Sequence, residues 1–329
     1  MNASGTLLKH ATRPEELEAL RPAWLELWQQ DTRATAFMHP DWVLPWCRHF
    51  GRDRIEAFSV WRGNRLVGLA PMEIWPEENG RLLKLLGSGI SDQLDVLTAP
   101  EYDAEVREAL VAQFQQSAGS WDLCLLEPLG DQSLWAGDGR SRRIDVSPAL
   151  ELPSHVEELS SVVPPHLLSN VRAARRRLER TAPLRSATAT PREVDGWMSA
   201  LFELHRARWR QRGEGGVLEE PSVLAFHRDI SRRLADAGVL RLHALFHGER
   251  LFAVLYAFAA HGRVHYYLSG FDPAYEKSSP GSLIVAAALE EAIARGDRVF
   301  DFLRGGEPYK YAWGARDRPL WQRVVEVRT

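Results

Sequence analysis

One stretch of the chain, residues 264–314, constrains the fold more than any other. Residues 264–270 are aromatic and β-branched, which predicts a strand, and residues 271–279 carry the Asp-Pro, Ser and Lys of a loop. Apolar residues then recur at helical spacing, and residues 299–303 predict a second strand. The stretch therefore reads as a βαβ-like unit, and open α/β sheets usually bind ligands at the loop that follows such a first strand.

The start of the expected helix has the chemistry of an anion site. Ser279 suits the N-cap, and Pro280 suits the first helical position. The backbone N–H groups of Gly281, Ser282 and Leu283 are then expected to be unpaired, and Gly281 has no side chain to block close approach. Such a helix end prefers an anion, especially a pyrophosphate. An ordinary capped helix packed on a sheet is the alternative.

Two motifs in this stretch resemble a known family. The loop KSSPGS at 277–282 resembles the acyl-CoA pyrophosphate loop of the GNAT acyltransferase superfamily. DFLRGGEPYKYAWG at 301–314 resembles the signature that closes the CelD-type (cellulose-biosynthesis) branch, which is itself similar to the FemAB and FemX peptidoglycan transferases. The resemblance runs from about residue 164 to residue 314. The loop departs from the commoner pattern of a Gln or Arg followed by spaced glycines, because Lys277 and a single glycine stand in its place.

The resemblance implies a co-substrate and a set of site residues. It implies acyl-CoA, in particular acetyl-CoA, and no metal. The residues expected to bind the co-substrate belong to the loop and the helix start: Lys277, Ser279, Gly281, Ser282 and Leu283. Acyl transfer from a thioester to an amine also needs stabilisation of the oxyanion and a base for the attacking ammonium group.

Candidates for that chemistry cluster after the second strand. In GNAT folds, as the resemblance implies, a Glu or Asp serves as base and a Tyr as acid, so the hypothesis makes Glu307 or Asp301 the base and Tyr309 or Tyr267 the acid. Lys310 lies just before Trp313-Gly314 and resembles the reaction-centre lysine of FemX-like relatives. The alternative is that these charged residues form surface ion pairs.

Three further residues are expected to bind substrate anions or the acceptor. Arg304 at the strand end joins Lys310 as a clamp for a carboxylate, a phosphate or the oxyanion. Asp92 lies in an acidic loop similar to one in CelD-like proteins, with turn capping as its alternative. Arg208 lies in ELHRARWRQRGEGG, which resembles an Arg-Trp helix end of the same family.

Composition narrows the class of protein. A chain of 329 residues has room for two domains, and 45% hydrophobic with 26% charged residues is typical of soluble globular proteins. The net charge of −3 gives no global attraction to nucleic acid or anionic lipid. Cys47 and Cys124 are too few for a disulfide framework or a cysteine-rich zinc site. With no export signal and no apolar run long enough to span a membrane, a cytoplasmic protein is expected.

A weak internal repeat predicts two copies of one fold. Aligning the hairpin turn at Gly63 with that at Gly248 gives an offset of 185 residues, and residues 121–128 resemble residues 298–305 at an offset of about 177. The predicted fold class is α/β (α+β), with two tandem GNAT-like domains that each have a mixed central sheet flanked by helices. The predicted division is an N-terminal domain at 1–160, a linker helix at 161–185 and a C-terminal acyltransferase domain at 186–329.

Residues 166–180 of the predicted linker helix carry five arginines, which raises a nucleic-acid hypothesis. Residues 166–180 are amphipathic, however, and no aromatic residues interleave with the basic ones. A solvated helix that packs by its leucine face is the favoured interpretation.

The function expected from these features is N-acyl transfer from acyl-CoA to a primary amine, on an amino sugar, a polysaccharide precursor or an amino acid. Two alternatives stay open. One is a FemX-like transfer of an aminoacyl group from transfer RNA to a cell-wall precursor. The other is a non-catalytic acyl-CoA-binding protein in exopolysaccharide assembly.

Overall fold

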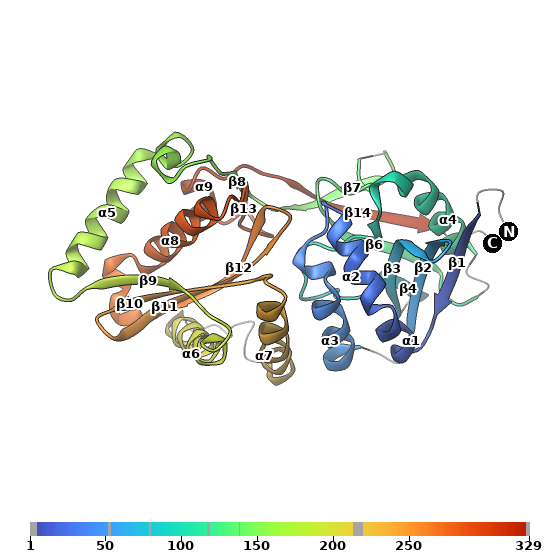
Figure 1. The fold of residues 1–329 in the computed structure, drawn as a ribbon, viewed down its shortest axis with the longest axis horizontal. Helices are drawn as coiled ribbons and strands as arrows, with labels where there is room; N and C mark the ends of the chain where they lie inside the picture. The colour runs from blue at the N-terminus through green and yellow to red at the C-terminus, as the bar shows by residue number, and fades with distance from the viewer. Residues whose placement is uncertain are drawn as a thin grey trace. The chain divides into compact units, whose positions relative to one another are not determined.

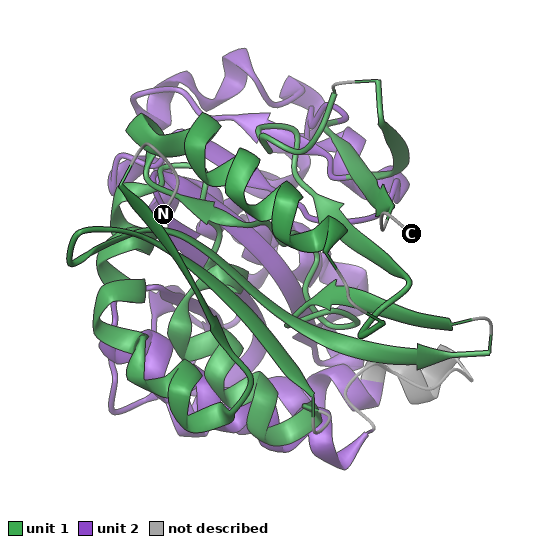
Figure 2. Ribbon diagram, turned by 90° about the vertical axis from the view of Figure 1, so that its right-hand side faces the viewer, with its two compact units in different colours: residues 1–146, 318–329 green, residues 147–317 purple. Residues whose placement is uncertain are grey.

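The structure is a computed structural model with two compact units. It describes residues 5–51, 54–78, 80–116, 119–137, 139–212 and 220–326, without the side chains of residues 208–212. Unit 1 contains residues 1–146 and 318–329, and unit 2 contains residues 147–317 (Figure 2). The predicted division into domains at 1–160, 161–185 and 186–329 stays a prediction, because compactness does not show which segments fold on their own.

Unit 1 is built on one mixed sheet. Its described strands run in the order β1-β2-β3-β4-β6-β14-β7, with β5 paired to β3. The strands are β1 (Thr6–Ala11), β2 (Ile55–Arg62), β3 (Arg65–Glu77), β4 (Gly80–Leu85), β5 (Leu97–Thr98), β6 (Leu123–Leu129), β7 (Ser141–Val146) and β14 (Pro319–Glu326). The helices are α1 (Pro14–Ala19), α2 (Arg21–Gln30), α3 (Pro40–Phe50) and α4 (Asp103–Gln115), with short 3₁₀ helices at Ala36–Met38 and Pro100–Tyr102.

Unit 2 is built on a second mixed sheet of similar order, β9-β10-β11-β12-β13-β8. The strands are β8 (Ala149–Glu151), β9 (Leu184–Thr188), β10 (Leu240–His247), β11 (Arg250–Ala260), β12 (Arg263–Phe271) and β13 (Val299–Asp301). The helices are α5 (Pro165–Glu179), α6 (Val194–Arg212), α7 (Pro221–Asp236), α8 (Pro280–Ala294) and α9 (Pro308–Ala312), with 3₁₀ helices η3 (Val156–Ser161) and η5 (Pro273–Ser278). Two mixed sheets flanked by helices confirm the predicted fold class.

Helices cover both faces of the sheet of unit 2 (Figure 1). α8 is apolar on almost every side, and its Leu283, Ile284 and Leu289 are buried in a core shared with α5 and with β11 and β12. A helix of this composition belongs between other elements rather than at a surface. α6 packs on the opposite face, where a Cβ added to Gly270 of β12 would lie 2.7 Å from the backbone nitrogen of His205. Glycine at this position lets the helix approach the strand closely.

The hairpins of the two units share an irregularity as well as a turn. In β2–β3 the pairing register shifts between Val60 and Trp61, and in β10–β11 it shifts between Leu245 and Phe246, 185 residues later. The turn glycines Gly63 and Gly248 both have a φ of +59°. A β-bulge at the same position of two hairpins is a more specific match than the hairpins themselves. The repeat predicted from the sequence is therefore present in the structure.

Each sheet also contains one parallel pair whose strands are joined through a helix. β12 and β13 pair in parallel across α8, and β4 and β6 pair in parallel across α4. The first of these pairs confirms the βαβ unit predicted for residues 264–303. The neighbouring strand comes from a distant part of the chain in both sheets: β14 lies beside β6 in unit 1, and β8 lies beside β13 in unit 2.

Candidate functional site

The candidate site lies at the carboxyl end of the parallel pair β12–β13 in unit 2. The two strands pair only from Arg263 to His265 on β12 and from Val299 to Asp301 on β13. β12 continues to Phe271, so its last six residues run past the end of β13. The backbone groups on that edge of β12 therefore do not pair with β13. An extended ligand could form hydrogen bonds with them, as an added strand does.

A β-bulge lies in this projecting part of β12. Tyr256 of β11 is opposite Leu268, and Ala257 is opposite Tyr266, so Tyr267 is the extra residue. A bulge bends the strand and redirects its backbone and side chains. The Tyr267 ring lies 5.3 Å from the His227 ring, and burial lowers the pKa of His227 to about 3, so this imidazole is neutral.

The start of α8 differs in two ways from the expected cap. Ser279 has the backbone φ of +53° that a left-handed residue adopts, and its side chain makes no capping hydrogen bond. The Leu283 N–H donates to the Ser279 carbonyl oxygen at 3.1 Å, so only Gly281 and Ser282 keep the unpaired position predicted for all three. A Cβ added to Gly281 would meet no atom within 4 Å. The space beside Gly281 is therefore open.

Asp301 is fully buried at the end of β13. Its Oδ1 atom accepts hydrogen bonds from the Ser147 hydroxyl at 2.7 Å and from the Leu303 N–H at 2.8 Å. Leu303 has a φ of +60°, which is uncommon for a residue with a branched side chain. Asp301 therefore holds the loop after β13 in a strained conformation, and its carboxylate does not reach the surface.

Lys310 is also buried, and it closes the same loop. Its Nζ atom donates to the carbonyl oxygens of Leu303, Arg304 and Gly305 at 2.8, 2.8 and 2.9 Å. The Glu307 carboxylate lies 2.8 Å from the same ammonium group. An ammonium group has three N–H donors, so these four acceptors occupy it fully. The bonds favour a loop-holding role over the predicted role as an anion clamp.

The other predicted residues of this loop face outward. Glu307 keeps 55% of its side chain exposed, Tyr309 is 44% exposed, and Arg304 is exposed. Gly305 has a φ of +103°, and an added Cβ there would lie 2.8 Å from the Glu307 carboxylate. Glycine is required at this position both by the backbone conformation and by the approach of Glu307. Of the predicted catalytic groups, Glu307 and Tyr309 are the ones accessible to a ligand on this loop.

Some predicted site residues lie elsewhere. Asp92 is half-buried in unit 1, in a loop whose Ser91 hydroxyl accepts a hydrogen bond from the Trp42 indole at 3.0 Å. The side chain of Arg208 lies outside the described residues. Lys277 is exposed on η5, one residue before the loop that leads into α8.

Two residues at the site were not predicted. Ser147 binds Asp301 although the two are 154 positions apart, and no local pattern marks such a pair. Leu303 is distinguished by its positive φ. A leucine in the sequence does not indicate such a backbone conformation.

In unit 1 the parallel pair β4–β6 corresponds to β12–β13, and α4 corresponds to α8. At the start of α4 a carboxylate of the chain itself occupies the position where an anion would bind. Arg33 donates to both carboxylate oxygens of Asp103, in the first turn of α4, at 2.8 Å each. The Leu94 N–H donates to the Pro128 carbonyl oxygen at 2.8 Å, beyond the residues of β6 that pair with β4. A carboxylate at this helix end repels a phosphate.

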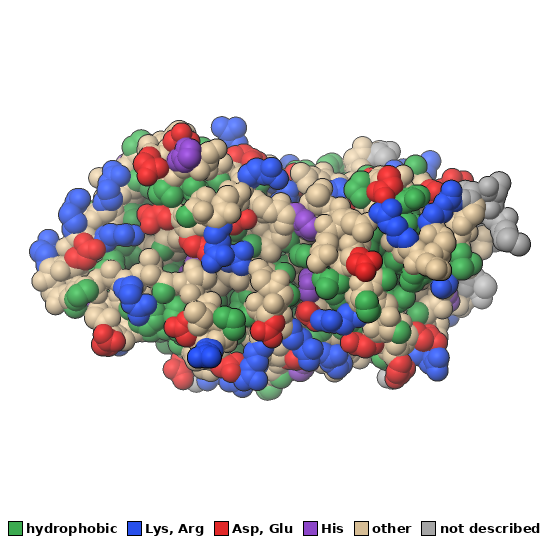
Figure 3. Space-filling model, in the orientation of Figure 1, with side chains coloured by type: hydrophobic (Ala, Val, Ile, Leu, Met, Phe, Trp, Pro, Cys, Tyr) green, Lys and Arg blue, Asp and Glu red, His purple; other side chains and the backbone are tan. Residues whose placement is uncertain are grey.

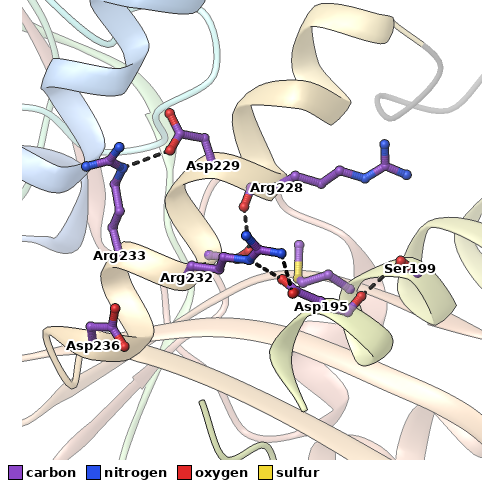
Figure 4. A pocket seen from close by; sticks show the side chains of 9 residues that line it. Asp195, Ser199, Arg228, Asp229, Arg232, Arg233 and Asp236 are labelled. Carbon is purple, nitrogen blue, oxygen red and sulfur yellow. Dashed lines mark hydrogen bonds and ion pairs between the residues drawn. The ribbon is translucent and has the colours of Figure 1, made fainter. Parts of the chain in front are cut away.

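A cavity of about 530 Å³ lies between α6 and α7 of unit 2, and it contains none of the predicted site residues. Its charged side chains are largely paired with each other. Figure 4 shows the Arg232 guanidinium directed at Asp195 and Arg233 directed at Asp229, the latter pair at 2.8 Å. A second cavity of about 660 Å³ lies along α4 of unit 1 and is lined by Arg107, Glu108 and Arg323 among others.

The comparison with protein families identifies part of the chain. Residues 166–311 match the model of the acetyltransferase (GNAT) domain. This part of the chain is similar to a GNAT acetyltransferase domain. The match covers α5 to α9, including the whole β12–α8–β13 unit described above. A GNAT domain supports an acyltransferase activity, and no curated protein sequence matches the chain.

Solved structures show that the fold of the GNAT domain and its partner unit is shared. FemX has a TM-score of 0.68 at 10% identity, with 97% of each chain covered. L-PGS from Bacillus licheniformis has a TM-score of 0.60 at 13% identity, covering 97% of this chain and 93% of that one. A tandem GNAT protein from the clavulanic acid biosynthesis pathway has a TM-score of 0.52 at 14% identity, covering 98% and 100%. At these identities the similarity concerns the fold alone.

The described residues contain neither a cluster of metal-ligating side chains nor a helix able to cross a membrane. No group of three or more His, Cys, Asp and Glu side chains there is placed to hold a metal ion. The helices in the same residues are all too short or too polar to cross a membrane.

Proposed function

We propose that this protein is a CelD-type N-acyltransferase that moves an acyl group, in the simplest case acetyl, from acyl-CoA to a primary amine in the cytoplasm. The observation that carries the proposal is that one β12–α8–β13 unit contains both the open space at Gly281 and the projecting, bulged part of β12 at Tyr267. The helix end suits a pyrophosphate, and the projecting strand edge suits an extended thioester arm.

In this proposal the chain holds the co-substrate mainly with backbone groups. The N–H groups of Gly281 and Ser282 bind the pyrophosphate, with Ser279, Leu283 and Lys277 shaping the loop around it. Backbone N–H groups near the bulge at Tyr267 stabilise the oxyanion that forms when the amine attacks the thioester carbonyl. Such donors act without reorganisation because the bulge fixes them beforehand.

The proton transfers are assigned to the accessible side chains. Glu307 takes a proton from the attacking ammonium group, and Tyr309 or Tyr267 gives a proton to the departing thiolate of CoA. Asp301 and Lys310 are positioning residues, because both are buried and both bind the backbone of the loop that carries Glu307. Arg304 and Arg208 are proposed to bind the acceptor, which is an amino sugar, a polysaccharide precursor or an amino acid. The role of Asp92, which belongs to unit 1, stays a prediction.

Calorimetric titration with CoA, acetyl-CoA and a longer acyl-CoA tests the proposal. We expect micromolar binding that is lost in Gly281→Glu, since the new carboxylate repels the pyrophosphate. Gly196→Glu is the matched control, because Gly196 lies in the first turn of α6 and its added Cβ also meets no atom within 4 Å. Binding that persists in Gly281→Glu contradicts the assigned position.

A FemX-like transfer from aminoacyl-tRNA is the second candidate. It is favoured by the TM-score of 0.68 to FemX over 97% of both chains and by the exposed arginines of α5. Failure of all three CoA compounds to bind, together with binding of transfer RNA at physiological salt, would establish this alternative. CoA binding without turnover of any amine would instead favour a non-catalytic protein of exopolysaccharide assembly.

A further inference from the structure

The C-terminal end of α5 is fixed against the loop that leads into α8. The Arg177 Nη1 atom donates to the carbonyl oxygen of Lys277 at 3.0 Å. The His247 imidazole ties the same two segments together, with Nε2 lying 3.1 Å from the Leu178 carbonyl oxygen and Nδ1 lying 3.2 Å from the Tyr275 hydroxyl. These contacts hold the last turn of α5 beside η5, at residues that lie four and six positions before Gly281.

The charge at this junction is predominantly positive. Arg177 and Arg180 lie on the same side of α5 at a spacing of three residues, and both are exposed. Lys277 is exposed on the facing loop. Glu179 and Glu276 are the carboxylates on these two segments. Figure 3 shows several blue side chains along the edge of the molecule where α5 runs.

Among the residues that the structure describes, Arg177 holds the loop through one hydrogen bond. A guanidinium group has five N–H donors in a planar fork that matches the oxygens of a phosphate. Anchoring through one N–H to a backbone carbonyl orients the group and leaves its other edge exposed. Arg177 is thus both pre-oriented and available to an anion, unlike the arginines on the outer face of α5.

We propose that Arg177 and Lys277 form a subsite for the 3′-phosphate of CoA. The inference rests on the proposed function and adds a specificity determinant to it. CoA carries its pyrophosphate and its ribose 3′-phosphate at the same end, so a pyrophosphate at the start of α8 brings the second group to the surrounding surface. A phosphate monoester carries close to two negative charges at neutral pH and is therefore attracted to exposed cations. Lys277 on η5 and Arg177 on the last turn of α5 are exposed cations held beside the loop that leads into α8.

Comparison of CoA with 3′-dephospho-CoA by calorimetry tests the subsite. We expect the full-length wild-type chain to bind CoA about fivefold more tightly than 3′-dephospho-CoA, a ratio typical of exposed charge pairs. In Arg177→Gln and in Lys277→Gln the ratio should fall toward one because CoA affinity drops while 3′-dephospho-CoA affinity stays. Arg172→Gln, an exposed arginine on the outer face of α5, should keep the wild-type ratio. Arg177→Lys should keep part of the preference for CoA over 3′-dephospho-CoA.

The outcomes separate the subsite from the proposed function. Equal affinities of the wild-type chain for CoA and 3′-dephospho-CoA would overturn the subsite and leave acyl-CoA binding intact. A Gln variant that weakens both ligands equally would also overturn it, because Arg177 would then act only as an anchor of the loop. Failure of both ligands to bind the folded wild-type chain would overturn the proposed function and the subsite together.

Discussion

The Nζ atom of Lys310 lies 2.8 Å from the carbonyl oxygen of Leu303, the residue that follows β13 with a φ of +60°. The same Leu303 donates its N–H to the buried carboxylate of Asp301. The buried Asp301 carboxylate therefore binds the N–H of the strained Leu303, and the buried Lys310 ammonium group binds its carbonyl oxygen. This arrangement makes Asp301 and Lys310 structural supports for the exposed Glu307.

Removal of the Lys310 ammonium group should destabilise the fold. Lys310→Met leaves three backbone carbonyls without their donor, and we expect the free energy of unfolding to fall by about 2–4 kcal/mol. Urea denaturation followed by circular dichroism measures this. Lys277→Met, which replaces an exposed lysine, should change the value by less than about 0.5 kcal/mol. Equal midpoints for the two variants would refute a supporting role for Lys310.

Loss of the proposed base should affect turnover more than binding. Glu307→Gln keeps a side-chain oxygen near Lys310 but cannot take a proton, so kcat for acetyl transfer should fall by roughly 10²- to 10⁴-fold with unchanged acetyl-CoA affinity. Glu290→Gln on α8 is the control, since Glu290 is an exposed partner of Arg175. Normal turnover in Glu307→Gln, together with normal turnover in Asp301→Asn, would remove the present assignment of the site.

One molecule of CoA should bind per chain. The helix end of unit 1 that matches the start of α8 already carries Asp103 paired with Arg33. Calorimetry on the intact chain should therefore give a stoichiometry of one, and Gly281→Glu should abolish binding altogether rather than halve it. A stoichiometry of two would show that unit 1 has a site of its own.

Replacement of Ser279 should show whether this residue strains the start of α8 or stabilises it by capping the helix. Ser279→Gly should raise the free energy of unfolding by about 0.5–1 kcal/mol, because glycine adopts a φ of +53° without the steric cost that serine bears. Ser282→Gly, within the first turn of α8, should instead lower it by about 0.5–1 kcal/mol. Loss of stability in both variants would point to a capping bond of the Ser279 side chain.

Stability should fall as the solution is acidified below pH 6.5. Burial lowers the pKa of His39 to about 4 and those of His227 and His243 to about 3, from an ordinary value of 6.5. The unfolded chain therefore binds protons that the folded chain does not, so each histidine stabilises the fold above pH 6.5 and loses this contribution toward pH 3–4. Asp95 opposes the trend, because burial raises its pKa from 3.8 to about 7.

The histidine contribution is measurable at a single position. Between pH 4.5 and 6 the free energy of unfolding of His227→Phe should depend less steeply on pH than that of the wild type, by about 1.4 kcal/mol per pH unit. Urea denaturation at several pH values gives both slopes. Parallel curves would mean that His227 is protonated in the folded state as well.

The elements that depend on local signals were predictable. The β12–α8–β13 unit, the two hairpins and α5 lie within a few residues of their predicted bounds, because turn residues and side-chain periodicity act over short distances. Elsewhere local patterns are not sufficient. Residues 14–30 carry apolar residues at helical spacing, but they divide into α1 and α2, since Pro22 lacks an N–H to continue the first helix. Residues 130–148 are rich in turn formers, but they contain β7, whose partner β14 follows more than 170 residues later.

The sequence by itself determined the β12–α8–β13 unit, the repeat and the chemical character of the loop at Lys277 and Gly281. Tertiary structure alone decided that Ser147 supports Asp301, that Lys310 binds three carbonyls of its own loop, and that Tyr267 is the bulged residue. The physical reason is that a hydrogen bond requires its partners to be about 3 Å apart whatever their separation along the chain. Residue type and spacing restrict which groups can bond, and only the packed sheet brings a particular pair within that distance.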